Sequence, residues 1–491
     1  MLSRRSRIPP FWFFLLLAVA LRWGSFFISV IDHDESTYIV IADELLRGKV
    51  YLRDVVDTKP IGIFWVYALL NTVTGGSIPL LRLATAAVIA LGSWGLYVAN
   101  LRATGHRTAG YVAGVLYVWM NSVFTDYGMS PNTEHYFNAL TIWAVAISVA
   151  APRKRWGWAG LLLGLAFIIK PFAAAEAGAV GLYLVWHYRR DVPRMLGRGL
   201  QLVATWGLPL AAVVAYYWWL DLLPALWFYS VEVSAAYPIE LPWYLRLKYM
   251  GDYLLRYSPF ILCGLAGARV LKSRTSKRPL ERSDFGPLSV RSGEREWLYY
   301  LALQAVFVTT VILLTGKRFG HYQIQLHPVV ALWVGATAGV VWRAVWQRRG
   351  VLVGLWVVAV AVGIGHGVYY WGKEDRPREV AEYFKGNLLP GEQVFGLGYQ
   401  MVYHLLSQPV PVAYVHPSLL FYPHHTNVLG VNQREVVQQI IENQAIHYIY
   451  GEVDDPISDT PLRDSLLQYF EPYDTVATKF IVHRRYVPED E

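Results

Sequence analysis

The chain has 491 residues, of which 55% are hydrophobic and only 16% are charged, and its formal net charge is +8. Soluble domains usually carry about 25% charged residues, so this composition excludes an ordinary soluble multidomain protein. The 20 Trp and 33 Tyr residues exclude a disordered chain or a coiled coil, and we expect no nucleic-acid partner. The single cysteine, Cys263, excludes an intrachain disulfide. The composition therefore predicts a polytopic membrane protein.

Eleven apolar stretches are candidate membrane spans, because a helix needs about 20 apolar residues to cross the hydrocarbon core of a bilayer. They cover residues 10–31, 79–100, 108–122, 135–151, 157–170, 172–187, 199–220, 253–271, 297–315, 325–342 and 351–371. A further apolar stretch, 60–74, is short and is interpreted as a half-buried or re-entrant segment. The N-terminal run resembles the start of a signal peptide, but no small-residue cleavage site follows it, which favours an uncleaved anchor.

The distribution of Lys and Arg predicts the orientation of these spans. With the N-terminus inside, the inside segments carry 23 Lys and Arg residues and the outside loops carry 8. Counting 60–74 as a full span would invert this asymmetry downstream, so the positive-inside rule favours eleven spans. The N-terminus is then cytoplasmic and the C-terminus extracytoplasmic, and the basic inside loops suit a bacterial inner membrane.

The C-terminal residues 372–491 differ in composition from the rest of the chain. They hold 9 basic and 17 acidic residues, a net charge of −8, which leaves +16 for residues 1–371. Short apolar runs alternate with a helical pattern in which Val436, Ile440 and Ile441 share a face. The runs that read as strands are EQVFGLG, PVPVAYV, AIHYIYGE and TVATKFIVH. We predict a transmembrane catalytic domain over 1–371 and a small extracytoplasmic α/β domain over 372–491.

The first outer loop, residues 32–59, is the densest polar region beside the predicted membrane. It begins with Asp32, Asp34 and Glu35 and ends at Lys59. Carboxylates next to hydrocarbon are costly and therefore mark a candidate site. The alternative is a solvated acidic loop whose lysine extends its amine to the interface.

A helix is expected within this loop. Ile41, Leu45 and Leu46 fall on one helical face, and Gly48 follows them as a stop signal. The pattern predicts a helix lying on the bilayer surface, after which Lys59 and Pro60 lead the chain back towards the membrane. Two carboxylates and a lysine are thereby brought to one interface, where a lipid phosphate would lie.

These residues resemble the first loop of the GT-C glycosyltransferases, in particular the group of protein O-mannosyltransferases and lipid A aminoarabinose transferases. The resemblance covers residues 30–340, and its motifs stand in the family's order on one predicted side of the membrane. They are Asp34-Glu35 with Tyr38, Ala42, Gly48 and Lys59-Pro60, then Arg82, PNTEHYF at 131–137, GLAFIIKP at 164–171 and GKRFGHYQIQLHP at 316–328.

The sequence departs from this family at two positions. In the aminoarabinose transferases an acid directly precedes the lysine, whereas here Thr58 stands there and Asp57 lies one residue earlier. A second proline often follows the first, whereas here Ile61 follows. These departures argue for a different sugar or acceptor. The run 32–34 also spells the Asp-x-Asp pattern of nucleotide-sugar transferases, but three residues match too often by chance to favour that class.

The resemblance implies a mostly helical GT-C fold and an inverting membrane glycosyltransferase. Such enzymes transfer a sugar from a polyprenyl-phosphate donor to a lipid, glycan or protein acceptor on the outer side. It implies that Asp34 is either the catalytic base, because the acceptor must lose a proton, or a carboxylate that anchors a metal ion. Glu35 is implied to support it. The residues implied to bind the donor phosphate are Lys59, Lys317, Arg318 and Tyr322.

The second outer loop adds a candidate acceptor or metal site at Asp126, Glu134 and His135. Together with Asp34 they are candidates to complete a divalent metal site, because carboxylate and imidazole ligands suit Mg²⁺, Mn²⁺ or Zn²⁺. The alternative is that Asp126 caps a turn and Glu134 begins the fourth span at its favourable N-terminus. Lys170 ends a predicted span, and we favour an amine that only reaches to the interface.

Two later segments carry weaker candidates. The segment 221–252 is rich in aromatic residues that suit an interfacial belt, although the family places it over the catalytic cavity. There the cations Arg246, Lys248 and Arg256 are candidates for phosphate binding. In the tail, VHPSLLFYPHHT contains His416, His424 and His425, and we favour a plain aromatic loop over a metal site.

Two other classes of function stay open at this point. A transporter or flippase of cell-envelope precursors would place charged residues inside the spans, and Arg22 lies within the first one. A non-catalytic scaffold for envelope assembly would bind partners without needing Asp34. The conspicuous acids lie at the outer interface, which favours the transferase.

Overall fold

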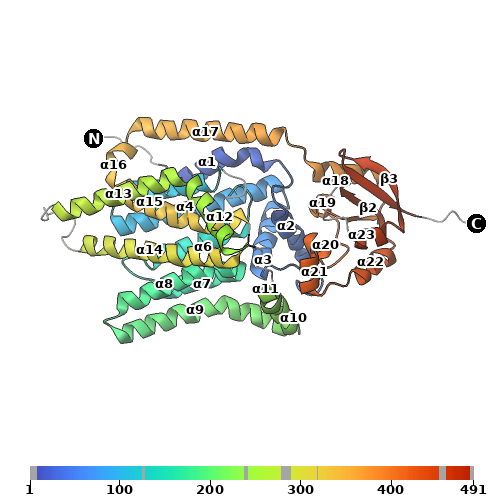
Figure 1. The fold of residues 1–491 in the computed structure, drawn as a ribbon, viewed down its shortest axis with the longest axis horizontal. Helices are drawn as coiled ribbons and strands as arrows, with labels where there is room; N and C mark the ends of the chain where they lie inside the picture. The colour runs from blue at the N-terminus through green and yellow to red at the C-terminus, as the bar shows by residue number, and fades with distance from the viewer. Residues whose placement is uncertain are drawn as a thin grey trace, which may run out of the picture. The chain divides into compact units, whose positions relative to one another are not determined.

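The computed structural model describes residues 8–123, 128–236, 241–277, 289–317, 319–452 and 461–486. It is mostly helical, with one small sheet near the C-terminus (Figure 1). The chain divides into two compact units. The first comprises residues 1–26, 82–213 and 239–371, and the second comprises 27–81, 214–238 and 372–491. The C-terminal segment therefore folds together with residues 27–81 and with the short middle segment 214–238.

The helices of the first unit run roughly alongside one another (Figure 1). In chain order they are α1 (Pro10–Arg22), η1 (Trp23–Phe26), α4 (Ile78–Thr104), α5 (Arg107–Met120), α6 (Thr133–Ile147), α7 (Trp156–Ile169), η3 (Pro171–Ala173), α8 (Ala174–Tyr188), most of α9 (Val192–Trp219), α12 (Trp243–Arg256), α13 (Ser258–Lys277), α14 (Ser289–Thr315), η5 (Gly320–Leu326), α15 (His327–Val341), α16 (Arg343–Trp346) and α17 (Arg349–Trp371). Each of the eleven predicted stretches overlaps one of these helices.

Helix length separates these stretches into two classes. In the described parts of the chain, five segments are long and apolar enough to cross a membrane: Ile78–Thr104, Val192–Trp219, Arg295–Thr315, Gly320–Val341 and Arg349–Trp371. A sixth span is added if α12 and α13, which meet at a bend of 75°, are counted together. Several other helices have only 13 to 15 residues. The chain is thus a helical membrane protein, and the count of eleven spans stays a prediction.

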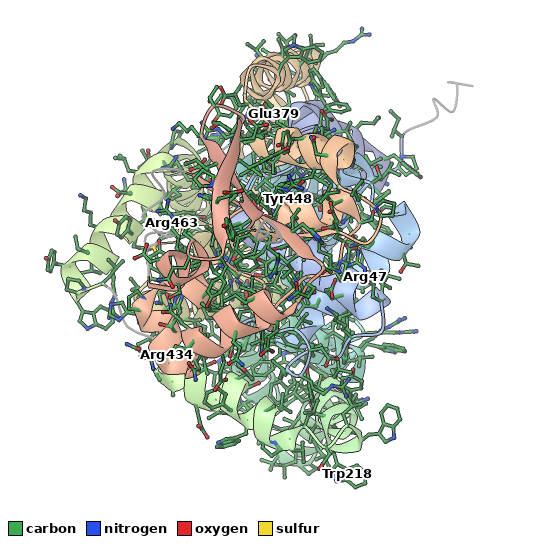
Figure 2. The ribbon with its side chains drawn as sticks, turned by 90° about the vertical axis from the view of Figure 1, so that its right-hand side faces the viewer. Arg47, Trp218, Glu379, Arg434, Tyr448 and Arg463 are labelled. Atoms are coloured by element: carbon green, nitrogen blue, oxygen red, sulfur yellow. The ribbon has the colours of Figure 1, made fainter. Side chains whose placement is uncertain are left out.

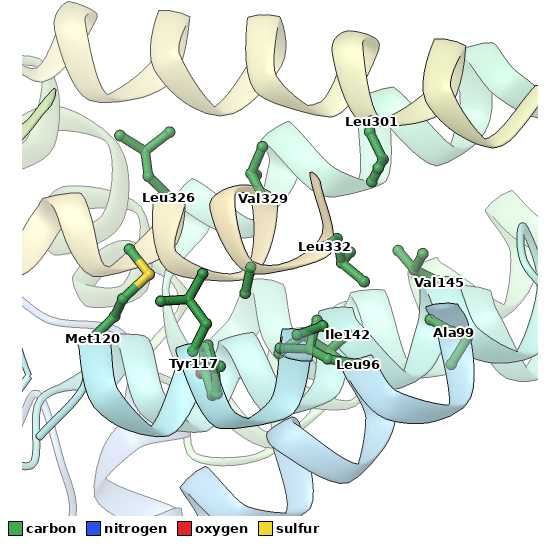
Figure 3. Close-up of a cluster of buried hydrophobic side chains, with 14 of the residues drawn as sticks. Leu96, Ala99, Tyr117, Met120, Ile142, Val145, Leu301, Leu326, Val329 and Leu332 are labelled. Carbon is green, nitrogen blue, oxygen red and sulfur yellow. The ribbon is translucent and has the colours of Figure 1, made fainter. Parts of the chain in front are cut away.

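Apolar side chains from several helices fill the core of the first unit. Leu96 on α4, Tyr117 on α5, Ile142 on α6 and Leu332 on α15 are buried in one cluster (Figure 3). Helices α5 and α15 approach closely because small residues line their contact. A Cβ added to Gly339 would lie only 2.8 Å from the Cα of Ala109. A larger residue at Gly339 would therefore force these two helices apart.

The second unit combines helices with a four-stranded sheet of order β1-β2-β4-β3. Strands β1 and β2 pair in parallel, whereas β4 pairs antiparallel with both β2 and β3. Tyr448 marks β2 in Figure 2. The strands are β1 (Gln393–Gly396), β2 (Ile446–Glu452), β3 (Phe470–Val476) and β4 (Phe480–Arg485). The helices are α2 (His33–Leu46), α3 (Ile61–Thr74), α10 (Leu223–Trp227), η4 (Phe228–Glu232), α11 (Val233–Ala236), α18 (Arg376–Asn387), α19 (Met401–Leu406), α20 (Ser418–Phe421), α21 (Pro423–Leu429), α22 (Gln433–Glu442) and α23 (Pro461–Leu466).

The predicted α/β character of the C-terminal segment is confirmed, with two differences in its strands. The run 475–483 is not one strand: it contains the end of β3, the hairpin turn with Ala477 and Thr478 at positive φ, and the first part of β4. The run 409–415 forms no strand beyond one isolated bridge at Tyr414. Prolines at 409 and 411 explain this, because proline has no N–H to donate to a ladder. The predicted helix is α22, which buries Val436 and Ile440.

Candidate functional site

The first turn of α2 carries the predicted carboxylates. Asp32 is the N-cap, and its side chain accepts a hydrogen bond from the backbone N–H of Asp34 at 3.2 Å. Asp34 and Glu35 follow in the first turn, where the helix dipole favours negative charge. Glu35 is buried, and the N–H of Ile31 donates to its Oε2 at 3.4 Å. The helix start therefore fixes the direction of Asp34.

The helix ends close to where the sequence predicts it. It stops at Leu46, and Gly48 follows at a φ of +89°, a conformation that favours glycine. The predicted single apolar face is wrong, because Leu46 is 53% exposed whereas Ile39, Val40 and Ile41 are all buried. Helix α2 is thus buried on more than one face.

Lys59 and Asp34 lie in direct contact. The Nζ of Lys59 is 2.7 Å from Oδ1 of Asp34 and 3.5 Å from Oδ2 of Asp57. It also lies 5.7 Å from the ring centroid of Tyr38. The segment before Lys59 is held by Tyr51, whose hydroxyl donates to the backbone carbonyl of Asp57 at 2.7 Å. One ammonium therefore faces two carboxylates.

The position of Asp57 explains why the chain can lack an acid at position 58, directly before Lys59. Its Oδ1 accepts a hydrogen bond from the N–H of Thr58, while its Oδ2 faces Lys59. An acid two residues before the lysine therefore still reaches the ammonium. The missing acid at Thr58 does not remove the second negative charge from this site.

His416 completes this group, which we call the Asp34 cluster: Asp34, Asp57, Lys59 and His416. Its Nε2 lies 3.9 Å from Oδ1 of Asp34, and its Nδ1 accepts from the N–H of Ser418 at 3.2 Å. Burial, followed by the nearby charge of Lys59, lowers the pKa of His416 from 6.5 to about 4. The imidazole is therefore neutral at pH 7. The prediction of a plain aromatic loop missed this residue, because nothing local in the sequence links it to Asp34.

A second carboxylate–lysine pair lies in the first unit. Lys170, at the end of α7, contacts Oε1 of Glu134, in the first turn of α6. The Nζ of Lys170 lies 4.1 Å from the ring centroid of Tyr322 and 4.9 Å from that of Phe172. We call Glu134, Lys170, Phe172 and Tyr322 the Lys170 cluster. The interpretation of Lys170 as reaching out to the interface is wrong, since its side chain is only 14% exposed and that of Glu134 is fully buried.

Two buried residues that the sequence did not single out hold Tyr322 over this lysine. The amide Nε2 of Gln325 donates to the carbonyl of Phe172 at 2.9 Å and to Oε2 of Glu176 at 2.8 Å. These bonds tie η5 to the segment that follows α7. From the other side, Asn138 on α6 donates to the carbonyl of Ile324 at 3.1 Å. The only sequence feature that could have indicated Gln325 and Asn138 is that they are polar residues inside predicted spans.

The remaining candidates of the two outer loops occupy different settings. His135 is buried, and its Nε2 bonds the carbonyl of Ser130 at 3.0 Å. Lys317 is half-buried in the turn between α14 and η5. Asp126 and Arg318 lie outside the described residues. In the first unit, the structure therefore places Glu134 and Tyr322 together but gives His135 a backbone partner.

Two of the predicted metal ligands already have protein partners, and the third, Asp126, lies outside the described residues. Glu134 is engaged by Lys170, and the Nε2 of His135 by a backbone carbonyl. Within the described ranges, no group of three or more His, Cys, Asp or Glu side chains is placed to hold a metal ion. We therefore assign no step to a metal.

Arg22, which is buried, and Arg246, which is half-buried, donate hydrogen bonds to backbone carbonyls of the protein. Arg22 donates to the carbonyls of Gly128 at 2.8 Å and Met129 at 2.7 Å. Arg246 donates to the carbonyls of Leu241 at 2.7 Å and Leu313 at 3.0 Å. Both guanidinium groups therefore anchor backbone segments. Lys248 and Arg256 are exposed on α12.

Comparisons with known proteins agree with the helical architecture. The sequence profile of the family described as dolichyl-phosphate-mannose-protein mannosyltransferase matches residues 58–218. The crystal structure of ArnT from Cupriavidus metallidurans in the apo state is similar, with a TM-score of 0.64 and 14% identity over 96% of this chain and 97% of that one. The structure of the same protein bound to undecaprenyl phosphate gives a TM-score of 0.65 and 14% identity over 97% and 98%. No curated protein matches the sequence significantly. The fold of this chain is similar to that of ArnT, and the predicted resemblance to the GT-C glycosyltransferases is confirmed.

Proposed function

We propose that this chain is an integral membrane glycosyltransferase that transfers a sugar from a polyprenyl-phosphate donor to a lipid, glycan or protein acceptor on the extracytoplasmic face. The observation that carries the proposal is the contact of 2.7 Å between Lys59 and Asp34 at the start of α2. A base and a phosphate-binding cation within one cluster are what this reaction needs. The similarity to a structure that holds undecaprenyl phosphate supports the same donor class.

The proposed step is a single displacement with inversion at the anomeric carbon. The acceptor nucleophile forms a bond to that carbon while the bond from the carbon to the phosphate oxygen breaks, and the bonding electron pair leaves with the phosphate. The acceptor proton passes to a carboxylate oxygen of Asp34. The ammonium of Lys59 gives up its contact with Asp34 and compensates the negative charge that develops on the leaving phosphate.

Glu35 and Asp57 support this arrangement in different ways. Glu35 is buried in the first turn of α2, so it fixes the backbone that carries Asp34. Asp57 keeps a negative charge beside Lys59 when Asp34 takes up the proton. His416 is neutral, so it adds no charge that would hold Asp34 ionised.

The finer assignments of the other residues are also proposals. Lys317, Arg318 and Tyr322 are proposed to bind the donor phosphate, with Tyr322 supported by the buried pair of Glu134 and Lys170. We place the protein in a bacterial inner membrane, with a cytoplasmic N-terminus and residues 372–491 outside. The charge bias of the loops supports this orientation.

The test is turnover by the full-length protein in lipid vesicles, with a panel of polyprenyl-phosphate sugars and a membrane extract as acceptor. Release of polyprenyl phosphate is measured for the wild type and for Asp34→Asn. The matched control is Asp54→Asn, which removes a carboxylate of the same loop that pairs with Arg53. We expect release by the wild type and the control and loss of release in Asp34→Asn.

Two outcomes would contradict the proposal. Equal turnover by the wild type and Asp34→Asn would remove the proposed base. No release with any donor, together with facilitated movement of a lipid or solute across the vesicle membrane, would assign the chain to transport.

A further inference from the structure

A groove lies at the end of α7 opposite to Lys170. Its volume is about 530 Å³, and it runs between the N-terminal part of α7 and α9. Residues that line it include Arg155, Trp158, Leu161, Arg198, Gln201 and Leu208. Because α7 has 14 residues, the groove begins about 21 Å from Lys170 along the helix axis. It is therefore separate from the Lys170 cluster.

Glycines of α7 bring the two helices together. Gly160 and Gly164 lie one helical turn apart on the face that meets α9. A Cβ on Gly160 would lie 2.2 Å from the carbonyl oxygen of Leu202, and one on Gly164 would lie 2.3 Å from that of Trp206. The backbones are thus in contact, which fixes the spacing of the helices and the shape of the groove between their side chains.

The groove is positively charged. Three of its lining residues are cations, and none of the lining residues that the structure describes is acidic. Lys154 is committed to the protein, since its ammonium donates to the carbonyl of Val149 at 2.8 Å. Arg155 and Arg198 are exposed, and the guanidinium of Arg198 donates to Oε1 of Gln201 at 3.0 Å. An anion in the groove would therefore meet two arginine side chains.

Apolar side chains continue from these arginines. Trp158 is 63% exposed and Leu208 is 57% exposed. Leu161, which also lines the groove, lies on α7 beside them. Tryptophan beside arginine at a helix end is typical of the level of lipid headgroups, and leucine and valine are typical of the level of acyl chains. The groove thus has the polarity profile of one lipid molecule.

We propose that this groove binds a phospholipid with an anionic headgroup, whose phosphate lies against Arg155 and Arg198 and whose acyl chain follows Leu161 and Leu208. In the orientation that the loop charges predict, this end of α7 faces the cytoplasm, where anionic lipids attract basic segments. The inference is independent of the proposed transferase reaction, because it uses other residues and predicts binding alone.

The test is native mass spectrometry of the full-length protein in detergent with added phosphatidylglycerol or phosphatidylcholine. We expect the wild type to retain phosphatidylglycerol preferentially. The variant Arg155→Gln/Arg198→Gln is expected to bind it about 30-fold more weakly, and each single variant about fivefold more weakly. The matched control is Arg107→Gln/Arg348→Gln, which removes two exposed arginines of the same predicted side outside the groove. A thermal melt establishes that each variant is folded, and the single variants provide the test if the double variant is not.

Three outcomes would overturn the proposal. The first is equal retention of the two lipids by the wild type. The second is an equal loss of phosphatidylglycerol in the control, which would mean a general effect of charge. The third is displacement of the lipid by inorganic phosphate at the same concentration, which would mean an anion site without lipid specificity.

Discussion

The Asp34 cluster and the Lys170 cluster are both built on a lysine, a carboxylate and an aromatic ring, but they differ in burial. The side chains of Lys59 and Asp34 are 23% and 18% exposed, whereas those of Lys170 and Glu134 are 14% exposed and fully buried. Lys59 faces a second carboxylate, while Lys170 lies between two aromatic rings. An accessible pair can exchange its partners for a ligand, and a buried pair must keep its own.

This comparison teaches that the same residue types form an exchangeable pair at one place and, at the other, a fixed pair that supports the neighbouring Tyr322. Removing one partner of a buried pair leaves an uncompensated charge, which costs about 3–5 kcal/mol. A surface pair contributes about 0–1 kcal/mol, and the half-buried pair of Lys59 and Asp34 should lie nearer to this value than the buried pair does. Mutations in the two clusters should therefore divide between stability and activity.

The largest effect on stability is expected from Glu134→Gln. It leaves the ammonium of Lys170 without its carboxylate and should lower the free energy of unfolding by about 3–5 kcal/mol. The double variant Glu134→Gln/Lys170→Met should recover most of this loss, because it removes the buried charge. Denaturant unfolding in detergent measures both, with Asp34→Asn as the half-buried counterpart. A loss in Asp34→Asn as large as that in Glu134→Gln would remove the distinction between the clusters.

The next effect concerns ligand affinity. Lys59→Met should weaken the binding of undecaprenyl phosphate by about 10- to 100-fold, because a charge-assisted hydrogen bond contributes about 1.5–3 kcal/mol. Lys49→Met, which loses an ammonium that pairs with Glu44 in the same loop, serves as the control. Binding is measured by isothermal titration in detergent. Unchanged affinity in Lys59→Met would exclude a phosphate contact at this residue.

A smaller effect is expected at Gln325. Replacing it with Leu removes the donor that serves Phe172 and Glu176, which should cost about 1–3 kcal/mol. Because Tyr322 is then less well held over Lys170, we expect KM for the donor to rise more than kcat falls. Gln325→Asn retains an amide donor and should restore part of both. Thermal melts and steady-state kinetics check this, and a fall in kcat at constant KM would contradict the positioning role.

The smallest effect is a pH dependence from His416. Its pKa is lower in the folded protein than its ordinary 6.5, so the unfolded chain binds the proton more readily. Stability is therefore lost as pH falls through 6.5 towards 4, by less than about 1 kcal/mol between pH 7 and pH 6. His416→Asn keeps an acceptor for Ser418 but does not titrate. Unfolding curves at the two pH values compare them, and an equal loss in both proteins would place the titrating group elsewhere.

Local chemistry in the sequence was enough to predict part of this molecule. The length of the apolar stretches located the helices. The spacing of Asp34, Gly48 and Lys59 predicted a helix followed by a segment that leads back to its start, which brings the carboxylate and the lysine together. The helical membrane architecture and the small C-terminal sheet followed from composition. These features depend on residues near one another in the chain.

Long-range packing decided the rest. His416 reaches Asp34, and Lys170 reaches Glu134, only through the folded chain. The amphipathic reading of α2 failed because tertiary contacts bury residues on more than one of its faces. Glu176 and Gln325 carried only the weak signal of polar side chains in apolar stretches. No pattern within one segment encodes such pairings.

The most direct test of the central claim is a single-turnover measurement on Asp34→Asn at saturating polyprenyl-phosphate sugar. If Asp34 is the base, this variant should bind the donor like the wild type but release polyprenyl phosphate about 100- to 10,000-fold more slowly. A wild-type rate at equal occupancy would contradict the assignment of the reaction to the Asp34 cluster.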